Sequence, residues 1–165
     1  MLEGGRLCSR KDDCQARALT DLGSSKNFAK SITLPAFQSS DAEANPLWYE
    51  ANQVFLPYCG GDLHGGTRET NEDPDTWGLF FSGHWIVRAM IEDLKTKENL
   101  EDADLVVLSG GSAGGIGVFY NVDIIAEELL PTVKVLGVPI GGFLFDHPAY
   151  DGPDAQNEEE TSSTA

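Results

Sequence analysis

A run of small residues around Ser112 is the part of this sequence whose residue types point most directly to chemistry. Residues 110–114 (GGSAG) satisfy the G-x-S-x-G pattern of a nucleophile elbow. Such a turn between a strand and a helix is so tight that side chains two places before and after the serine would collide. Ser112 would then stand exposed at a helix N-terminus, and the backbone N–H of Ala113 would point at an oxyanion developing on a substrate carbonyl.

The wider glycine-rich segment, residues 109–117 (SGGSAGGIG), allows other interpretations. A phosphate-binding P-loop needs a lysine followed by serine or threonine, and the segment contains no lysine. Gly111, Gly115 and Gly117 reproduce a G-x-x-x-G-x-G spacing that resembles short-chain dehydrogenases, but no later tyrosine is followed by lysine at the fourth place. An NAD(P)-dependent oxidoreductase is therefore the less favoured alternative, and a turn that only packs a helix on a strand also stays open.

Apolar segments on both sides of the serine predict the elements that must hold it. Residues 103–108 (ADLVVL) and 133–138 (VKVLGV) are branched apolar runs, typical of parallel strands covered on both faces. An i, i+3, i+4 recurrence predicts amphipathic helices over residues 76–97 and 117–130. A further strand is predicted over residues 52–58 (NQVFLPY). The alternation of strands and helices predicts an α/β fold with a parallel sheet.

Composition predicts one globular unit and disfavours several functions. The 165 residues are 41% hydrophobic and 23% charged, as in ordinary globular domains. A formal net charge of −16 repels phosphate backbones, so no nucleic-acid partner is expected. No apolar run has the length of a membrane span, and the first residues lack a signal-peptide stretch. We assign residues 1–150 to the folded body and expect residues 151–165 to form an acidic flexible tail.

The cysteines favour a disulfide over a metal site. Cys8, Cys14 and Cys59 leave one thiol unpaired in any internal pairing scheme, and the first two are close enough in sequence to close a small loop. No CxxC occurs, and the single pairing of Cys59 with His64 lacks the spacing of a zinc cluster. No metal and no cofactor is therefore expected.

Several short motifs follow one another in a fixed order from residue 2 to about residue 146. They are LEGG at residues 2–5 with Cys8 and Cys14, NP at 45–46 with Trp48, VFLPYC at 54–59 with Asp62, SGGSAGGIG at 109–117 and NVD at 121–123. Together they resemble the pectin acetylesterase and Notum family of serine carboxylesterases. The resemblance implies an α/β-hydrolase-like parallel sheet flanked by helices. It also implies hydrolysis of carboxylic esters on an acylated polysaccharide or an acylated protein.

The resemblance assigns roles to individual residues. It implies the nucleophile Ser112, an oxyanion hole made by the backbone N–H groups of Gly5, Arg6 and Ala113, and a disulfide between Cys8 and Cys14. Notum-like members carry tryptophan where this chain has Arg6, so the pocket wall there is expected to differ. Cys59 matches a family cysteine whose partner has no place in this sequence.

The acid and base of the family triad lie beyond the NVD motif, and no segment of this chain matches them. We therefore expect an apparently incomplete domain, in which His64 and His147 are the candidate substitutes for the base. A serine hydroxyl without a base is a weak nucleophile, so a catalytically incomplete fragment or binding module is the alternative function. Family members are mainly exported, which implies an extracellular or secretory location, although the N-terminus shows no signal peptide.

Overall fold

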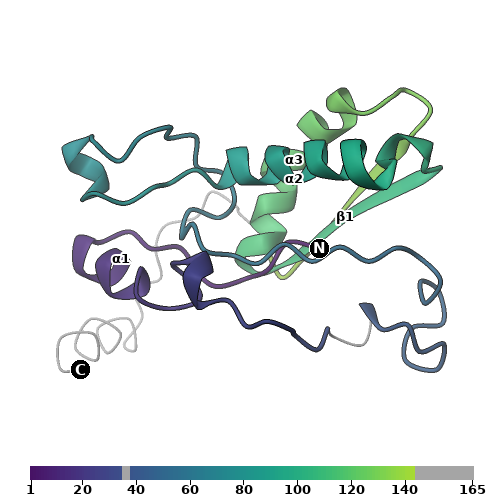
Figure 1. Ribbon diagram of the computed structural model, residues 1–165, viewed down its shortest axis with the longest axis horizontal. Helices are drawn as coiled ribbons and strands as arrows, with labels where there is room; N and C mark the ends of the chain where they lie inside the picture. The colour runs from purple at the N-terminus through teal and green to yellow at the C-terminus, as the bar shows by residue number, and fades with distance from the viewer. Residues whose placement is uncertain (35–37, 144–165) are drawn as a thin grey trace.

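Strands β1 (Leu105–Gly111) and β2 (Lys134–Ile140) form the centre of the fold and pair in parallel, with Leu108 opposite Gly137. The computed structural model describes residues 1–34 and 38–143. The remaining elements are α1 (Lys11–Arg17), α2 (Gly83–Glu98), α3 (Ala113–Glu128) and the 3₁₀ turns η1 (Ser25–Asn27), η3 (Pro74–Thr76) and η4 (Leu100–Asp102). Figure 1 shows α2 and α3 next to each other beside β1, with α1 well apart from them.

The N-terminal segment extends the sheet on the other side of β1. Leu2 forms isolated parallel bridges with both Gly110 and Leu56. Its N–H donates to the carbonyl of Ser109 at 2.7 Å, and the next N–H, that of Glu3, donates to Leu56 at 3.1 Å. Because these bonds align residues 1–3 with the end of β1, the LEGG motif lies directly beside the elbow.

The core fills the space between the sheet and the two long helices. Gly137 faces α3, since a Cβ there would stand 3.1 Å from Val118. The hydrophobic core consists of Leu2, Val87, Ile91, Leu108, Val118, Ile125, Leu129 and Val133. Among the described residues, no helix is both long enough and apolar enough to cross a membrane.

The parallel α/β arrangement predicted from the apolar runs is confirmed, and it is compatible with part of an α/β-hydrolase-like fold. The strands begin one or two residues later than predicted and include the glycines and Pro139 at their ends. The strand predicted over residues 52–58 is reduced to the single bridge at Leu56. Residues 151–165, the predicted tail, lie outside the described residues.

The first long helix begins later than the apolar periodicity predicted. Trp77 and Gly78 both have left-handed backbone, with φ of 54° and 79°, which separates η3 from the helix. Helix α2 therefore starts at Gly83 instead of residue 76, and ends before the left-handed Asn99. Helix α3 starts four residues earlier than predicted, at Ala113, because its first turn consists of the glycines that were interpreted as a turn.

Candidate active site

Ser112 occupies the junction between β1 and α3 in a strained backbone conformation. Its φ of 53° and ψ of −118° lie outside the regions that a non-glycine residue usually adopts. Its N–H donates to the carbonyl of Ile140 on β2 at 2.8 Å, and its carbonyl accepts from Ile116 in the first turn of α3 at 3.1 Å. These bonds fix the backbone while the residue remains exposed. A sharp strand-to-helix turn with an exposed serine is compatible with the predicted nucleophile elbow.

The glycines on each side of Ser112 are required by backbone contacts. A Cβ on Gly110 would stand 2.3 Å from the carbonyl oxygen of Gly114. A Cβ on Gly114 would stand 2.2 Å from the carbonyl oxygen of Leu2, so this glycine admits the N-terminal segment to the elbow. These are the two positions at which the G-x-S-x-G pattern demands small residues.

Two glycines of the dinucleotide-like spacing are also used for packing within the chain. A Cβ on Gly115 would stand 2.9 Å from the carbonyl oxygen of Ile140, and one on Gly117 would stand 2.9 Å from the Cβ of His64. In a dinucleotide site the second glycine of the pattern, which is Gly115 here, lets the pyrophosphate approach the backbone. Here protein atoms occupy that space, which disfavours the dinucleotide interpretation.

The segment of the predicted oxyanion donors lies against the serine. A Cβ on Gly4 would stand 2.6 Å from the carbonyl oxygen of Gly111 and 3.2 Å from the Cβ of Ser112. The next residues, Gly5 and Arg6, have φ of 154° and 65°. No hydrogen bond within the described part of the chain uses the N–H groups of Gly5, Arg6 or Ala113. An oxyanion hole needs backbone N–H donors that no other acceptor uses.

His64 is placed beside the LEGG motif. The side chain is buried, with 2% of its surface exposed, and its Nε2 lies 2.9 Å from the carbonyl oxygen of Glu3. Burial lowers the pKa of this imidazole, so the neutral form donates from Nε2 to the carbonyl. No hydrogen bond within residues 38–143 or 1–34 joins it to Ser112. The other candidate base, His147, lies outside the described residues.

Asp62 and Tyr58 hold the backbone that carries His64. The carboxylate of Asp62 accepts the N–H of His64 at 3.2 Å and that of Gly83, the first residue of α2, at 2.6 Å. The hydroxyl of Tyr58 accepts the N–H of Leu63 at 2.7 Å. Leu63 and His64 both have left-handed backbone, with φ of 59° and 58°. Such strained residues cluster at functional sites when their surroundings hold them.

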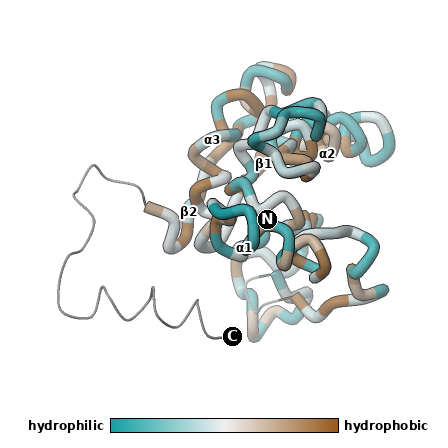
Figure 2. The backbone as a smooth tube through the Cα atoms, turned by 90° about the vertical axis from the view of Figure 1, so that its left-hand side faces the viewer, coloured by the Kyte–Doolittle hydropathy of each residue, from teal (hydrophilic) through white to brown (hydrophobic). Residues whose placement is uncertain are grey.

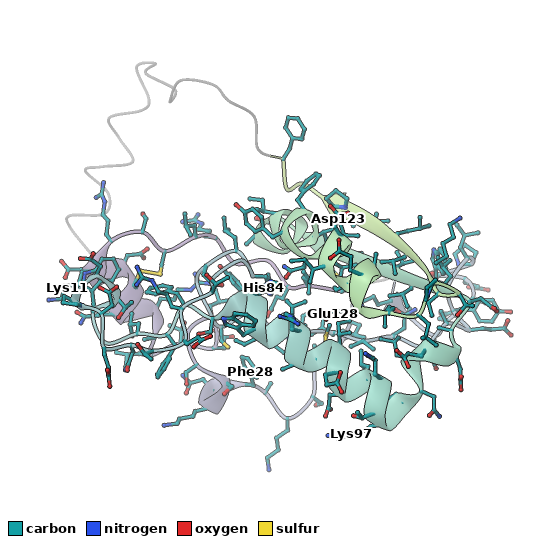
Figure 3. All side chains as sticks on the ribbon, turned by 90° about the horizontal axis from the view of Figure 1, so that it is seen from above. Lys11, Phe28, His84, Lys97, Asp123 and Glu128 are labelled. Atoms are coloured by element: carbon teal, nitrogen blue, oxygen red, sulfur yellow. A yellow bond between two sulfur atoms is a disulfide. The ribbon has the colours of Figure 1, made fainter. Side chains whose placement is uncertain are left out.

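Asn121, the first residue of the NVD motif, is a connecting residue that the sequence analysis did not assign. It is 1% exposed, and its Nδ2 donates to the carbonyls of His64 at 2.9 Å and Gly117 at 2.8 Å. Its Oδ1 lies 2.9 Å from Nδ1 of His84, which Figure 3 shows on α2 at the end opposite Lys97. The asparagine therefore links α2, α3 and the His64 loop, and its place in a motif was the available signal.

Comparison with known proteins places this site in a family. The sequence matches the Pectinacetylesterase family over residues 1–162. The chain belongs to the pectinacetylesterase family. It is 34% identical over 155 residues to the human palmitoleoyl-protein carboxylesterase NOTUM, covering 90% of this chain and 30% of the relative. It is 35% identical over 147 residues to pectin acetylesterase 5 of Arabidopsis thaliana, covering 89% of this chain and 34% of the relative. The chain thus spans about a third of the length of these relatives.

The cysteines of this pectinacetylesterase-family chain lie close to its LEGG segment. A disulfide joins Cys8 to Cys14 in α1 and appears as a yellow bond near Lys11 in Figure 3. The N–H of Cys8 donates to the carbonyl of Gly61 at 2.9 Å, which ties this loop to the one that follows Cys59. Cys59 is a free thiol, and burial raises its pKa.

A largely apolar cavity opens next to the LEGG segment. Its volume is about 630 Å³, and one of its lining residues is Leu7, the residue after Arg6. The apolar side chains that line it are Leu7, Leu63, Phe81, Tyr120 and Ile124. Ser112 is not one of the lining residues. Within the part of the chain that the structure describes, no three His, Cys, Asp or Glu side chains are grouped so that they could hold a metal ion.

Proposed function

We propose that this chain provides the nucleophile and the oxyanion hole of a carboxylic ester hydrolase. The observation that carries the proposal is the strained Ser112 at the β1–α3 junction, together with the N–H groups of Gly5, Arg6 and Ala113, which no acceptor among residues 1–34 and 38–143 uses. The names of the relatives, palmitoleoyl-protein carboxylesterase and pectin acetylesterase, support an ester of an acylated protein or an acylated polysaccharide as substrate. The apolar cavity beside Leu7 supports binding of an acyl chain.

In the proposed reaction the Ser112 oxygen attacks the carbonyl carbon of the ester. The hydroxyl proton passes to a base, and the carbonyl oxygen becomes an oxyanion that accepts hydrogen bonds from Gly5, Arg6 and Ala113. Collapse of this intermediate breaks the ester C–O bond, and the departing alcohol takes up the proton. Water then attacks the acyl-serine in the same way, which releases the carboxylic acid and restores the hydroxyl.

A second candidate function is a catalytically incomplete module of the family that binds the acylated substrate. The hydrogen bonds of the described residues favour it, because none joins Ser112 to an imidazole. An oxyanion hole without a base leaves only a small part of the rate enhancement. Either function suits an oxidising, extracellular or secretory environment, since Cys8 and Cys14 form a disulfide.

Ester hydrolysis by the purified chain separates the two candidates. We would follow p-nitrophenyl acetate and p-nitrophenyl octanoate with the wild-type chain, Ser112→Ala, and Ser31→Ala as a control at an exposed serine. The hydrolase predicts turnover that falls to background only in Ser112→Ala. Turnover that survives in Ser112→Ala would contradict the proposed nucleophile. A folded wild-type chain without turnover would contradict the hydrolase and favour the second candidate, the binding module.

A further inference from the structure

Side chains from distant segments hold the backbone of the LEGG region by its carbonyl groups. Nη1 of Arg17 donates to the carbonyl of Gly5 at 2.5 Å, and the hydroxyl of Tyr58 donates to that of Arg6 at 3.0 Å. We propose that Arg17 is a positioning residue, which aims the N–H of Arg6 at the oxyanion, with Tyr58 as its support. This inference rests on the proposed function and deepens it.

The planarity of the peptide bond explains how a carbonyl contact can aim an N–H group. The carbonyl of Gly5 and the N–H of Arg6 belong to one trans peptide unit, in which they point in opposite directions. A donor that fixes the Gly5 oxygen from one side therefore fixes the Arg6 N–H toward the other side. Arg17 holds the oxygen, and the N–H remains without an acceptor among the described residues.

The guanidinium of Arg17 is itself fixed in three ways. Its Nε donates to the carbonyl of Leu22 at 2.8 Å, and its Nη1 donates to Gly5. The planar group lies over the ring of Tyr58, with its central carbon 5.0 Å from the ring centroid. A flat cation with several fixed donors holds one orientation, which a lysine ammonium does not. The carbonyl of Gly5 thus contacts a rigid group.

The Tyr58 hydroxyl donates to the next carbonyl of this segment, that of Arg6. Burial raises the pKa of Tyr58 to about 12, so the hydroxyl keeps the proton that it donates to the carbonyl of Arg6. The glutamate of the motif completes the attachment, because the Oε2 of Glu3 accepts the N–H of Tyr58 at 2.7 Å. Tyr58 therefore donates two hydrogen bonds to residues 3–6, one from its hydroxyl and one from its backbone N–H.

The backbone of Gly5 and Arg6 needs such support. Arg6 has a left-handed φ of 65°, which side-chain-bearing residues seldom adopt without outside contacts. A Cβ on Gly5 would stand 2.9 Å from both Leu22 and Tyr58 and 3.2 Å from Nη2 of Arg17. The close packing shows that the guanidinium and the ring define the path of this turn.

The test compares Arg17→Met with Arg17→Lys and with the control Arg88→Met. Arg88 also lies over an aromatic ring, that of Trp85 at 5.3 Å, but it pairs with Glu128 on α3. The first readout is the rate at which a fluorophosphonate labels Ser112 over a range of reagent concentrations. We expect Arg17→Met to lower the maximal rate about ten- to a hundredfold without changing the half-saturating concentration, since small misplacements in an active site cost rate. Arg17→Lys should restore part of the rate, and Arg88→Met should match the wild-type chain.

The second readout is the backbone amide spectrum, which needs no activity. In ¹⁵N-labelled protein, we expect Arg17→Met to shift the signals of Gly5 and Arg6 while that of Val87 in the core stays in place. If the wild-type chain is not labelled by the reagent, the proposed function fails and the amide signals alone decide the positioning role. Unchanged amide signals in a folded Arg17→Met variant would overturn the inference, as would an unchanged labelling rate in a wild type that reacts.

A second variant, Tyr58→Phe, keeps the proposal testable if Arg17→Met does not fold. Tyr58→Phe retains the ring under the guanidinium and removes the hydroxyl, which donates to the carbonyl of Arg6 and accepts the N–H of Leu63. We expect a smaller fall of the labelling rate and a shift of the amide signals that follow the Arg6 carbonyl. A Tyr58→Phe variant that equals wild type in both readouts would count against the proposal.

Discussion

Backbone strain concentrates around the candidate nucleophile. The described residues include six non-glycine residues with positive φ, and Arg6, Leu63, His64 and Ser112 among them belong to the site or its support. Each such residue costs about 1 to 3 kcal/mol and persists only where its neighbours determine it. Three contacts hold residues of this group or their neighbours in place. Arg17 donates to the carbonyl of Gly5, next to Arg6. The hydroxyl of Tyr58 accepts the N–H of Leu63, and the carboxylate of Asp62 accepts the N–H of His64.

Burial of His64 predicts a pH dependence of stability. The pKa of His64 is lowered in the fold from its ordinary value of 6.5, chiefly by burial, while Glu3 and Asp62 oppose the shift and the N-terminal ammonium adds to it. Between the folded pKa and 6.5, the unfolded chain therefore binds more protons at this residue than the folded chain does. The stability that this residue contributes is lost as the pH falls through 6.5 toward the folded pKa. We would measure the free energy of unfolding with urea at several pH values from 5 to 8. This free energy should depend less steeply on pH in His64→Gln than in the wild type. Equal slopes would contradict the buried neutral imidazole.

The sequence predicted a candidate nucleophile, Ser112, but it did not predict the residues that hold the backbone around it. Ser112 and its flanking glycines were identified because a tight turn imposes a local pattern that the sequence displays. Arg17, Tyr58 and Asn121 act through contacts between segments 12 to 57 residues apart. Tyr58 and Asn121 lie in motifs, but a motif does not show which distant residue each one contacts, and Arg17 lies in no motif. His64 was predicted as a candidate base, whereas its observed bond is to the carbonyl of Glu3.

At the scale of elements, the junction of β1, α3 and the N-terminal segment carries the site. The carbonyl of Leu2 lies where a side chain on Gly114 would stand, and Gly114 belongs to the first turn of α3. The helix, the strand and the LEGG segment consequently approach one another through backbone alone. This explains why the helix begins inside the glycine run, which periodicity of apolar residues could not show.

Replacement of Gly114 tests this junction. Gly114→Ala should destabilise the fold by about 1 to 3 kcal/mol, because the new methyl group overpacks against the Leu2 carbonyl. Alanine ordinarily stabilises a helix relative to glycine, so the expected sign is opposite to that of helix propensity. The matched control is Gly111→Ala, where a Cβ would meet no atom within 4 Å. Chemical denaturation measures both variants, and equal stabilities would refute the close approach.

At the scale of the whole molecule, one face of the sheet lacks a covering layer among the described residues. Gly137 faces α3, so the alternate residues of β2 lie on the opposite face. There Leu136, Val138 and Ile140 are 41%, 43% and 46% exposed. Figure 2 shows hydrophobic colouring along β2 at the side of the molecule. Parallel sheets are usually covered on both faces, and the relatives are about three times longer than this chain.

Because this face of the sheet is exposed, polar substitutions on it should lower the surface hydrophobicity with little change in stability. Replacing Leu136 and Val138 by threonine should reduce binding of a hydrophobic fluorescent dye and change the unfolding free energy by only about 0.5 kcal/mol per site, because both side chains are exposed. Val133→Thr is the control on the core side, where the side chain is 7% exposed, and it should destabilise the fold clearly. Dye binding that the double variant leaves unchanged would contradict the exposure of this face.

Covalent labelling reports directly whether Ser112 is an activated nucleophile. Purified chain would be incubated with a fluorophosphonate and measured by intact mass, with Ser112→Ala as the control. We expect one added phosphonyl group on the folded wild-type chain and none on the variant. A folded wild-type chain that stays unlabelled, or a label that persists in Ser112→Ala, would contradict this expectation.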